Sequence, residues 1–178
     1  HIGTAAWFQE HTGCKIYASQ GERAWIENID QQYKERPIPN FYKLAGKSTE
    51  VDVTVRNGDL IPLEENLNIQ VISTSGHSVD GVSYRLGKSL FLGDAIPVKG
   101  DIPIYINVRD TFKTLQTIRD LNGICNYYPA WDHTYSVSDI DEKINDAEHI
   151  ICTLDKQVQA ILEAGKETDI SVITNLVC

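Results

Sequence analysis

The sequence predicts a layered fold of the α/β or α+β class, in which helices pack on the faces of a β-sheet. Short apolar segments bounded by Gly or Asn predict strands in the middle of the chain. Apolar residues at helical spacing predict helices toward both ends. Helices and strands that each have one apolar face are stable when they bury those faces against one another. The length of 178 residues predicts a single domain, 1–178.

Three elements are predicted in the first part of the chain: a helix at 3–12, a strand at 14–19 and an amphipathic helix at 20–36. The first helix stops at Gly13, a residue type suited to the end of a helix. The third ends before a proline, because the residue preceding proline disfavours helical backbone. The segment 36–48 contains two prolines and predicts a loop.

The strands of the middle region are predicted from alternation and from apolar runs. Residues 50–55 alternate between apolar and polar, which predicts a half-buried strand. The Asn-Gly pair that follows, at 57–58, favours a tight hairpin turn. Three apolar segments then predict strands at 68–74, 81–86 and 88–93.

The last part of the chain is predicted to be mainly helical. An apolar stripe predicts a helix at 108–123. A strand at 124–131 is expected to break at Pro129. From Ser138, a plausible N-cap, the tail predicts helix, with a last helical segment at 169–178.

Composition excludes several classes of partner. The formal net charge is −9 and the chain has no cluster of Lys and Arg, so neither nucleic acid nor an anionic membrane is an expected partner. No apolar run approaches the roughly 20 residues that a membrane span requires. The four cysteines are scattered and are expected to be reduced thiols, and a cytoplasmic location is the default expectation.

Three predicted strands are followed by residue types that can bind metals. One is followed by Gly-His77 and another by Gly-Asp94, and a third predicted strand is followed by Asp132-His133. A carboxylate directly after an apolar strand is costly unless it is paired or binds a cation. Imidazole and carboxylate groups at one sheet edge suit a metal site, although polar residues that merely end strands remain an equal interpretation. The two histidines in predicted helices are interpreted as solvent-facing or capping residues, His11 and His149.

These motifs resemble those of the metallo-β-lactamase superfamily. "TSGHSVDGVSY" resembles the third motif of that family, "LFLGDAI" the fourth and "YPAWDHTYS" the fifth. The opening "HIGTAAWF" resembles the end of the His-x-His-x-Asp-His signature and the helix that follows it. The resemblance implies an αβ/βα sandwich with a metal site at one edge.

The resemblance also implies a set of metal ligands. His77 resembles the ligand that completes the first metal site, and Asp94 the carboxylate that bridges two metals. His1 and His133 resemble the imidazoles of the second metal. The cofactor implied is Zn²⁺, two per site, with iron or manganese as alternatives, and a metal-activated water is the implied nucleophile. Ser78 is expected to orient the His77 loop.

The sequence departs from the family pattern at its start. The two histidines and the aspartate that precede the last histidine of the signature are absent, as are the N-terminal strands of the first sheet. We expect an upstream segment of a longer protein to supply them. Asp132 stands where glycine is common and Ser75 where proline is common, and neither is expected to touch the ligands.

The predicted function is hydrolysis of a small-molecule ester, thioester or lactone. The short segment between Asp94 and His133 resembles glyoxalase II-like and lactonase-like members. Tyr135 resembles the tyrosine of a His-x-Tyr pair and could donate a hydrogen bond to a developing oxyanion, a surface tyrosine being the alternative. A single-iron persulfide dioxygenase of the same fold is a second hypothesis, and a non-catalytic domain that binds a partner is a third. The sequence leaves open whether the protein forms a homodimer.

Overall fold

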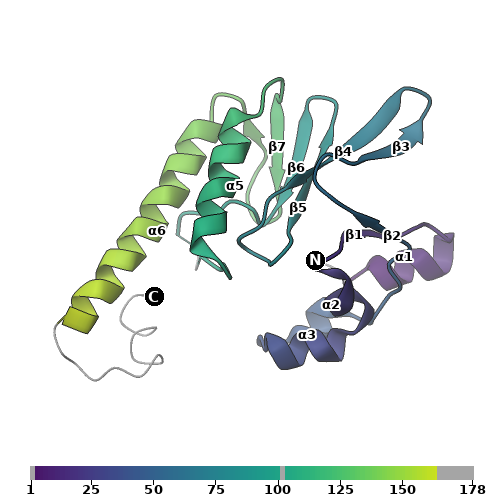
Figure 1. The fold of residues 1–178 in the computed structure, drawn as a ribbon, viewed down its shortest axis with the longest axis horizontal. Helices are drawn as coiled ribbons and strands as arrows, with labels where there is room; N and C mark the ends of the chain where they lie inside the picture. Colours follow the sequence, from purple (N-terminus) through teal and green to yellow (C-terminus); the bar gives the residue numbers. More distant parts are fainter. Residues whose placement is uncertain (1–2, 101–102, 164–178) are drawn as a thin grey trace.

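Two β-sheets and six helices make up the part of the chain that the computed structural model describes, residues 3–100 and 103–163 (Figure 1). The helices are α1 (Ala5–Thr12), α2 (Arg23–Glu27), α3 (Ile29–Glu35), α4 (Phe41–Ala45), α5 (Val108–Asp120) and α6 (Ile140–Glu163). The strands are β1 (Tyr17–Ser19), β2 (Val53–Val55), β3 (Leu60–Glu64), β4 (Leu67–Ser73), β5 (Val82–Leu86), β6 (Ser89–Gly93), β7 (Asn126–Pro129) and β8 (Tyr135–Ser136).

The larger sheet has six strands in the order β3-β4-β5-β6-β7-β8. Strands β3 to β6 pair antiparallel with their sequence neighbours, whereas β6 and β7 pair in parallel. Parallel neighbours need a crossover connection, and α5 provides it. Helices α5 and α6 lie together on one side of this sheet (Figure 1).

The main hydrophobic core lies between this sheet and the two helices. Leu90 and Leu92 point from β6 toward Leu115 and Ile118 of α5 and Ile144 of α6, and all five side chains are buried. Because side chains alternate along a strand, Phe91 between the two leucines faces the opposite side of the sheet.

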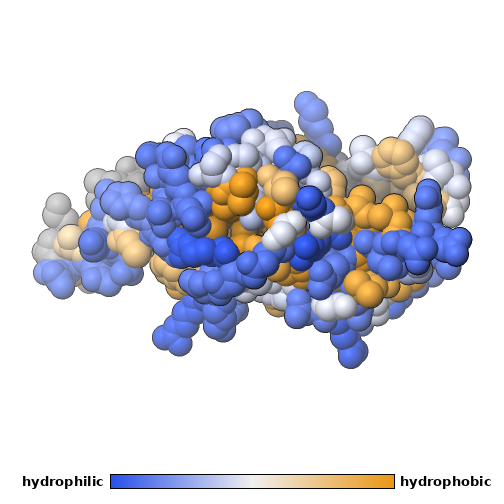
Figure 2. All heavy atoms as spheres, turned by 90° about the horizontal axis from the view of Figure 1, so that it is seen from above, coloured by the Kyte–Doolittle hydropathy of each residue, from blue (hydrophilic) through white to orange (hydrophobic). Residues whose placement is uncertain are grey.

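That opposite side carries exposed aromatic residues. The rings of Phe91 and Tyr128, which are register partners on β6 and β7, stack with their centroids 5.0 Å apart. Hydrophobic surface is also visible in the middle of the molecule when it is viewed from above, between hydrophilic borders (Figure 2). Among the described helices, none combines the length and apolar character needed to cross a membrane.

The N-terminal helices form a separate layer with its own small core. Ile29 of α3 packs with Phe41 and Ala45 of α4. Strands β1 and β2 pair in parallel and join this layer to the large sheet, where Val55 of β2 packs with Val71 of β4. The predicted α/β fold class is thereby confirmed.

The single helix predicted at 20–36 is wrong, because the chain forms two short helices there. Asn28 has non-helical backbone, with φ of −142° and ψ of 89°, and its side-chain oxygen accepts a hydrogen bond from the Gln31 amide at 3.0 Å. An asparagine that caps a new helix interrupts the preceding one. The loop predicted at 36–48 also contains a helix, α4, which forms because Phe41 buries its ring against the α3 layer.

The hairpin predicted at Asn57-Gly58 is also wrong. The strands on either side of this turn, β2 and β3, belong to different sheets. The turn instead binds β4, because the Gly58 amide donates to the Val71 carbonyl and the Asn57 side chain accepts from the Ser73 amide. A tight hairpin forms one strand later, where Asn66 adopts a φ of 65° between β3 and β4.

The other predicted elements agree with the structure apart from their ends. The three strands of the middle region are β4, β5 and β6, and the helix at 108–123 is α5, which Asn107 caps. Helix α6 begins at Ile140, so residue 139 rather than Ser138 precedes it. The helix predicted at 169–178 lies outside the described residues.

Candidate metal centre

His77 lies in the loop after β4, and Asp94 follows the end of β6. Strand β5 lies between these two strands and is antiparallel to both, so β4 and β6 run in the same direction. Their carboxyl ends therefore meet at one edge of the sheet. This topology explains how two side chains from non-adjacent strands come together.

The His77 loop is held in place by α5 and by the segment that leads into it. The Ile106 amide donates to the Gly76 carbonyl at 2.6 Å, and the Thr114 hydroxyl donates to the Ser75 carbonyl at 2.7 Å. Gly76 has a φ of 131°, a conformation that residues with a side chain rarely adopt. The loop therefore depends on glycine at this position.

The His77 ring is oriented by a backbone carbonyl. Its Nδ1 atom lies 2.8 Å from the Ile104 carbonyl oxygen, which can only accept a hydrogen bond. In the neutral ring, Nδ1 then bears the proton and Nε2 has a free lone pair. Nε2 lies 3.5 Å from Oδ2 of Asp94. This is the arrangement in which a metal-binding histidine is usually held.

Asp94 is largely buried, with 13% of its side chain exposed, whereas 30% of the His77 side chain is exposed. The strand that precedes it, β6, has two leucines in the main core. A mostly buried carboxylate is costly unless a cation or hydrogen-bond donors lie beside it. The pair thus combines one nitrogen and one oxygen donor at a partly accessible point, which suits a divalent cation.

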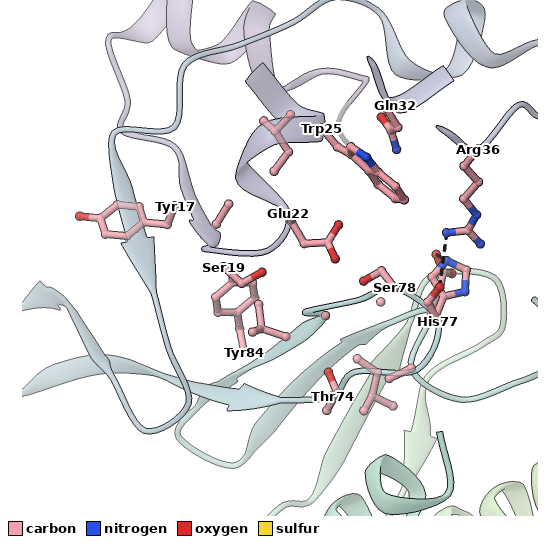
Figure 3. Close-up of a pocket in the computed structure, with 18 residues that line it drawn as sticks. Tyr17, Ser19, Glu22, Trp25, Gln32, Arg36, Thr74, His77, Ser78 and Tyr84 are labelled. Atoms are coloured by element: carbon pink, nitrogen blue, oxygen red, sulfur yellow. Dashed lines mark hydrogen bonds and ion pairs between the residues drawn. The ribbon is translucent and has the colours of Figure 1, made fainter. Parts of the chain in front are cut away.

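The His77–Asp94 pair borders two cavities. The first, of about 400 Å³, lies between the pair and the N-terminal layer, with Trp25, Gln32 and Arg36 on its far wall (Figure 3). The second, of about 430 Å³, lies on the other side and is mainly apolar; it is lined by Ile96, Pro97, Val98, Pro103, Ile104 and Trp131. A group bound at the pair would be reached from both cavities.

The structure does not bring His133 to this pair. Its side chain is 67% exposed, and its Nδ1 atom lies 2.6 Å from Oδ1 of Asp132. His133 lines neither of the two cavities. His1 lies outside the described residues. Within residues 3–100 and 103–163, no group of three or more His, Cys, Asp or Glu side chains is arranged to hold a metal ion.

The expectation that Asp132 would not touch the ligands is wrong, because its carboxylate binds His133. That carboxylate also accepts hydrogen bonds from the Tyr135 hydroxyl at 2.9 Å and from the Lys143 ammonium at 3.1 Å. Burial alone would raise the pKa of Asp132, but the His133 amide, Lys143 and Tyr135 outweigh it and hold that pKa well below its usual range. Asp132 therefore fixes the direction of the His133 ring.

Tyr135 is buried beneath this network rather than facing either cavity beside His77. Only 1% of the residue is exposed, and its hydroxyl is already donated to Asp132. Burial and the adjacent Asp132 carboxylate raise the pKa of Tyr135 above its ordinary value. In this conformation Tyr135 positions the 130–134 loop and does not reach the His77–Asp94 pair.

Sequence reasoning missed two residues on the far wall of the first cavity, Gln32 and Arg36. Arg36 donates from Nη1 to the His77 carbonyl at 3.4 Å, and Gln32 points into the cavity one helical turn earlier (Figure 3). The helical pattern of 20–36 indicated only a polar face there. The three-dimensional contact between this face and the His77 loop leaves no signal in the local sequence.

The family is established by sequence. The model of the Metallo-beta-lactamase superfamily matches residues 1–124 of this chain. No curated protein sequence gives a significant match. The chain belongs to the metallo-beta-lactamase superfamily, as the motifs around His77 and Asp94 predicted.

Solved structures show the same fold. A beta-lactamase domain protein from Burkholderia ambifaria is similar with a TM-score of 0.76 and 13% identity, covering 99% of this chain and 60% of its own. An archaeal metallo-beta-lactamase superfamily protein from Sulfolobus tokodaii has a TM-score of 0.65 and 17% identity, over 85% and 63%. A subclass B3 metallo-beta-lactamase of Bradyrhizobium japonicum has a TM-score of 0.66 and 19% identity, over 90% and 70%.

The chain thus spans about three fifths of the length of the first of these neighbours. The identities are too low for any neighbour to indicate a substrate.

Proposed function

We propose that this protein is a metal-dependent hydrolase of a small-molecule ester, thioester or lactone. The observation that supports this most directly is the His77–Asp94 pair, whose Nε2 and Oδ2 atoms lie 3.5 Å apart at the border of two cavities. A mostly apolar cavity with a few converging polar groups is typical of a small-molecule site.

The donor set of the pair fits a divalent cation such as Zn²⁺. His77 would contribute Nε2, whose lone pair is left available by the contact of Nδ1 with Ile104, and Asp94 would contribute a carboxylate oxygen. Two donors are fewer than a zinc ion requires. His1, which resembles the last histidine of the family signature, is a further ligand that we propose. Such a cation, when bound, lowers the pKa of a coordinated water and polarises the carbonyl that is attacked.

The chain's own residues would orient the substrate. The Ile104 carbonyl keeps the His77 proton on Nδ1, so that Nε2 remains a donor atom. The second cavity, walled by proline, isoleucine and valine side chains, accepts an apolar group and excludes water from one side of the pair. Removing water strengthens electrostatic interactions within a site.

The test is metal analysis and activity of the full-length protein. The protein is purified, its bound metals are measured, and it is assayed against panels of esters, thioesters, lactones and phosphodiesters. About two zinc ions per chain and turnover of the first three panels support the proposal. One iron per chain with oxygen consumption on a persulfide contradicts it, as does a protein that binds no metal and turns over none of the panels.

A further inference from the structure

The far wall of the first cavity contains a pair of hydrogen-bonding groups that the proposed metal centre does not use. Gln32 lies in α3, and Arg36 is the residue that ends this helix, with its backbone amide donating to the Gln32 carbonyl at 2.8 Å. Residues four apart lie on the same side of a helix. Both side chains line the cavity and point toward the His77 loop (Figure 3).

Most of the N–H donors of the Arg36 guanidinium form no hydrogen bond to the described residues. Its contact is the single hydrogen bond from Nη1 to the His77 carbonyl at 3.4 Å, and no carboxylate among the described residues forms an ion pair with it. A guanidinium has five N–H donors in a fork that matches a carboxylate. Most of this capacity is therefore available to a bound molecule.

The side-chain amide of Gln32 likewise forms no hydrogen bond to the described residues. Its Oε1 atom is buried and has no hydrogen-bond partner among the described residues. Native proteins leave few such atoms, because an unpaired buried polar group costs free energy. Oε1 is an acceptor and does not bind an anion, but the amide nitrogen of the same side chain donates to no described residue and lies toward the cavity (Figure 3). That nitrogen is the group of Gln32 that a bound carboxylate can use.

The acidic side of the same cavity limits what that ligand can be. Glu22 lines the cavity, and its Oε1 atom is held by the Asp80 amide at 3.0 Å. The negative charge of Glu22 repels a phosphate, which carries more than one charge, more strongly than it repels a singly charged carboxylate. A phosphate also binds where several donors and cations converge, whereas this cavity offers one guanidinium and one amide.

We propose that Gln32 and Arg36 form a carboxylate-binding subsite, so that the substrate is a carboxylic acid whose cleavable ester, thioester or lactone bond reaches the His77–Asp94 pair. The carboxylate accepts hydrogen bonds from the Arg36 guanidinium and from the Gln32 amide nitrogen. Trp25 provides an apolar wall beside it. This inference names the substrate class and rests on the proposed hydrolase function.

Binding is tested separately from turnover, so that failure of the subsite and failure of the hydrolase proposal can be told apart. Hexanoate and its neutral isostere hexanamide are titrated into the full-length, metal-loaded protein, and the Trp25 indole and Gln32 amide resonances are followed by NMR. We expect hexanoate to bind at least about tenfold more tightly than hexanamide. In Arg36→Met this preference is lost, whereas Lys34→Met, which removes a charge from the exposed side of α3, retains it.

Turnover is tested with the monothioester of glutaric acid and with the thioester of glutaramic acid, which replaces the carboxylate by an amide. The wild type should prefer the substrate that carries the carboxylate. In Arg36→Met, the kcat/KM of this substrate divided by that of the amide substrate should fall by about tenfold or more. An unchanged ratio, or unchanged binding of hexanoate, overturns the subsite. Absence of turnover with every substrate, while hexanoate still binds through Arg36, contradicts the hydrolase function instead.

Gln32→Leu separates a binding role from a structural one. Removal of an unpaired buried polar atom should leave the Tm unchanged or raise it, and hexanoate should bind about threefold more weakly. A lowered Tm with unchanged affinity for hexanoate overturns the part assigned to Gln32.

Discussion

The Nε2 atom of His77 faces the Oδ2 atom of Asp94 at 3.5 Å, although the two residues follow strands that are not neighbours in the sheet. The intervening strand, β5, is antiparallel to both, which places both strand ends at one edge. A hydrogen bond to the Ile104 carbonyl fixes the ring so that this approach is made by Nε2. The geometry of the pair is thus a product of sheet topology and of one backbone contact.

Asp94→Ala in the full-length protein should abolish activity and remove most of the bound metal, because the carboxylate is one of the two donors in the described site. Metal content and turnover are measured on the same preparation, and circular dichroism confirms that the variant folds. His149→Ala is the matched control. Because His149 is exposed on α6, this substitution should leave metal content and turnover unchanged. Full metal content in Asp94→Ala would exclude Asp94 as a ligand.

Gly76→Ala should destabilise the protein and loosen the His77 loop. A Cβ atom at this position would lie 2.6 Å from the Thr111 backbone nitrogen, at a φ of 131° that alanine rarely adopts. We expect a loss of about 2 to 4 kcal/mol in the free energy of unfolding. Urea denaturation measures it.

Gly87→Ala provides the comparison for that measurement. Gly87 also has a positive φ, of 59°, but a Cβ there meets no atom within 4 Å. Gly87→Ala should therefore lower the free energy of unfolding by only about 1 kcal/mol, the cost of left-handed backbone for alanine. If Gly76→Ala and Gly87→Ala lower the free energy of unfolding equally, the close approach to Thr111 does not destabilise Gly76→Ala.

Tyr135→Phe should lower stability and leave catalysis nearly intact. The hydroxyl is buried and donates to Asp132, so its loss costs about 1 to 3 kcal/mol. The ratio kcat/KM should change by less than about twofold. Tyr128→Phe, on the exposed face of the sheet, controls for loss of a phenol. A fall of about a hundredfold in kcat at unchanged stability would instead establish contact with the substrate.

Asp132→Asn should reveal a pH-dependent contribution to stability. The folded pKa of Asp132 lies below its unfolded value, so the ionised group stabilises the protein above about pH 4 and loses this effect as the pH falls toward the folded pKa. The difference in urea midpoint between wild type and variant should be constant from pH 5 to about pH 7 and shrink below about pH 4.

The ammonium partner of Asp132 offers a check on that result. In a Lys143→Met background the effect of Asp132→Asn should be smaller, because one of the groups that favours the carboxylate is gone. A difference between wild type and Asp132→Asn that grows as the pH falls would contradict the network described here.

The sequence was most informative where local pattern and tertiary structure agree. The apolar segments predicted as strands are β4, β5 and β6. The Gly-His77 motif follows the end of β4, and the Gly-Asp94 motif lies at the end of β6. The hairpin expected at Asn57-Gly58 failed because a turn signal does not identify the strand that the turn will pair with. That choice was made by the hydrogen bonds of Gly58 and Asn57 to β4.

The far wall of the first cavity was less predictable for a different reason. Gln32 and Arg36 look like ordinary polar residues of a surface helix, and only the break at Asn28 turns that helix toward the His77 loop. Similarly, Asp132 seemed an isolated replacement of glycine, yet it joins His133, Tyr135 and Lys143. In both places the role of the residue depends on contacts between segments that are distant in the sequence, which local patterns do not reveal.

The two walls of the first cavity rest on cores of very different size. His77 and Asp94 extend from strands anchored in the main core beneath α5 and α6, whereas α3 is held by the small cluster around Ile29. Segments with few buried apolar contacts open at lower free energy than the rest of a protein. Backbone amides of α3 should therefore exchange with solvent deuterium sooner than those of β4 and β6. Slower exchange in α3 on addition of a carboxylate would report the occupied cavity without any measurement of turnover.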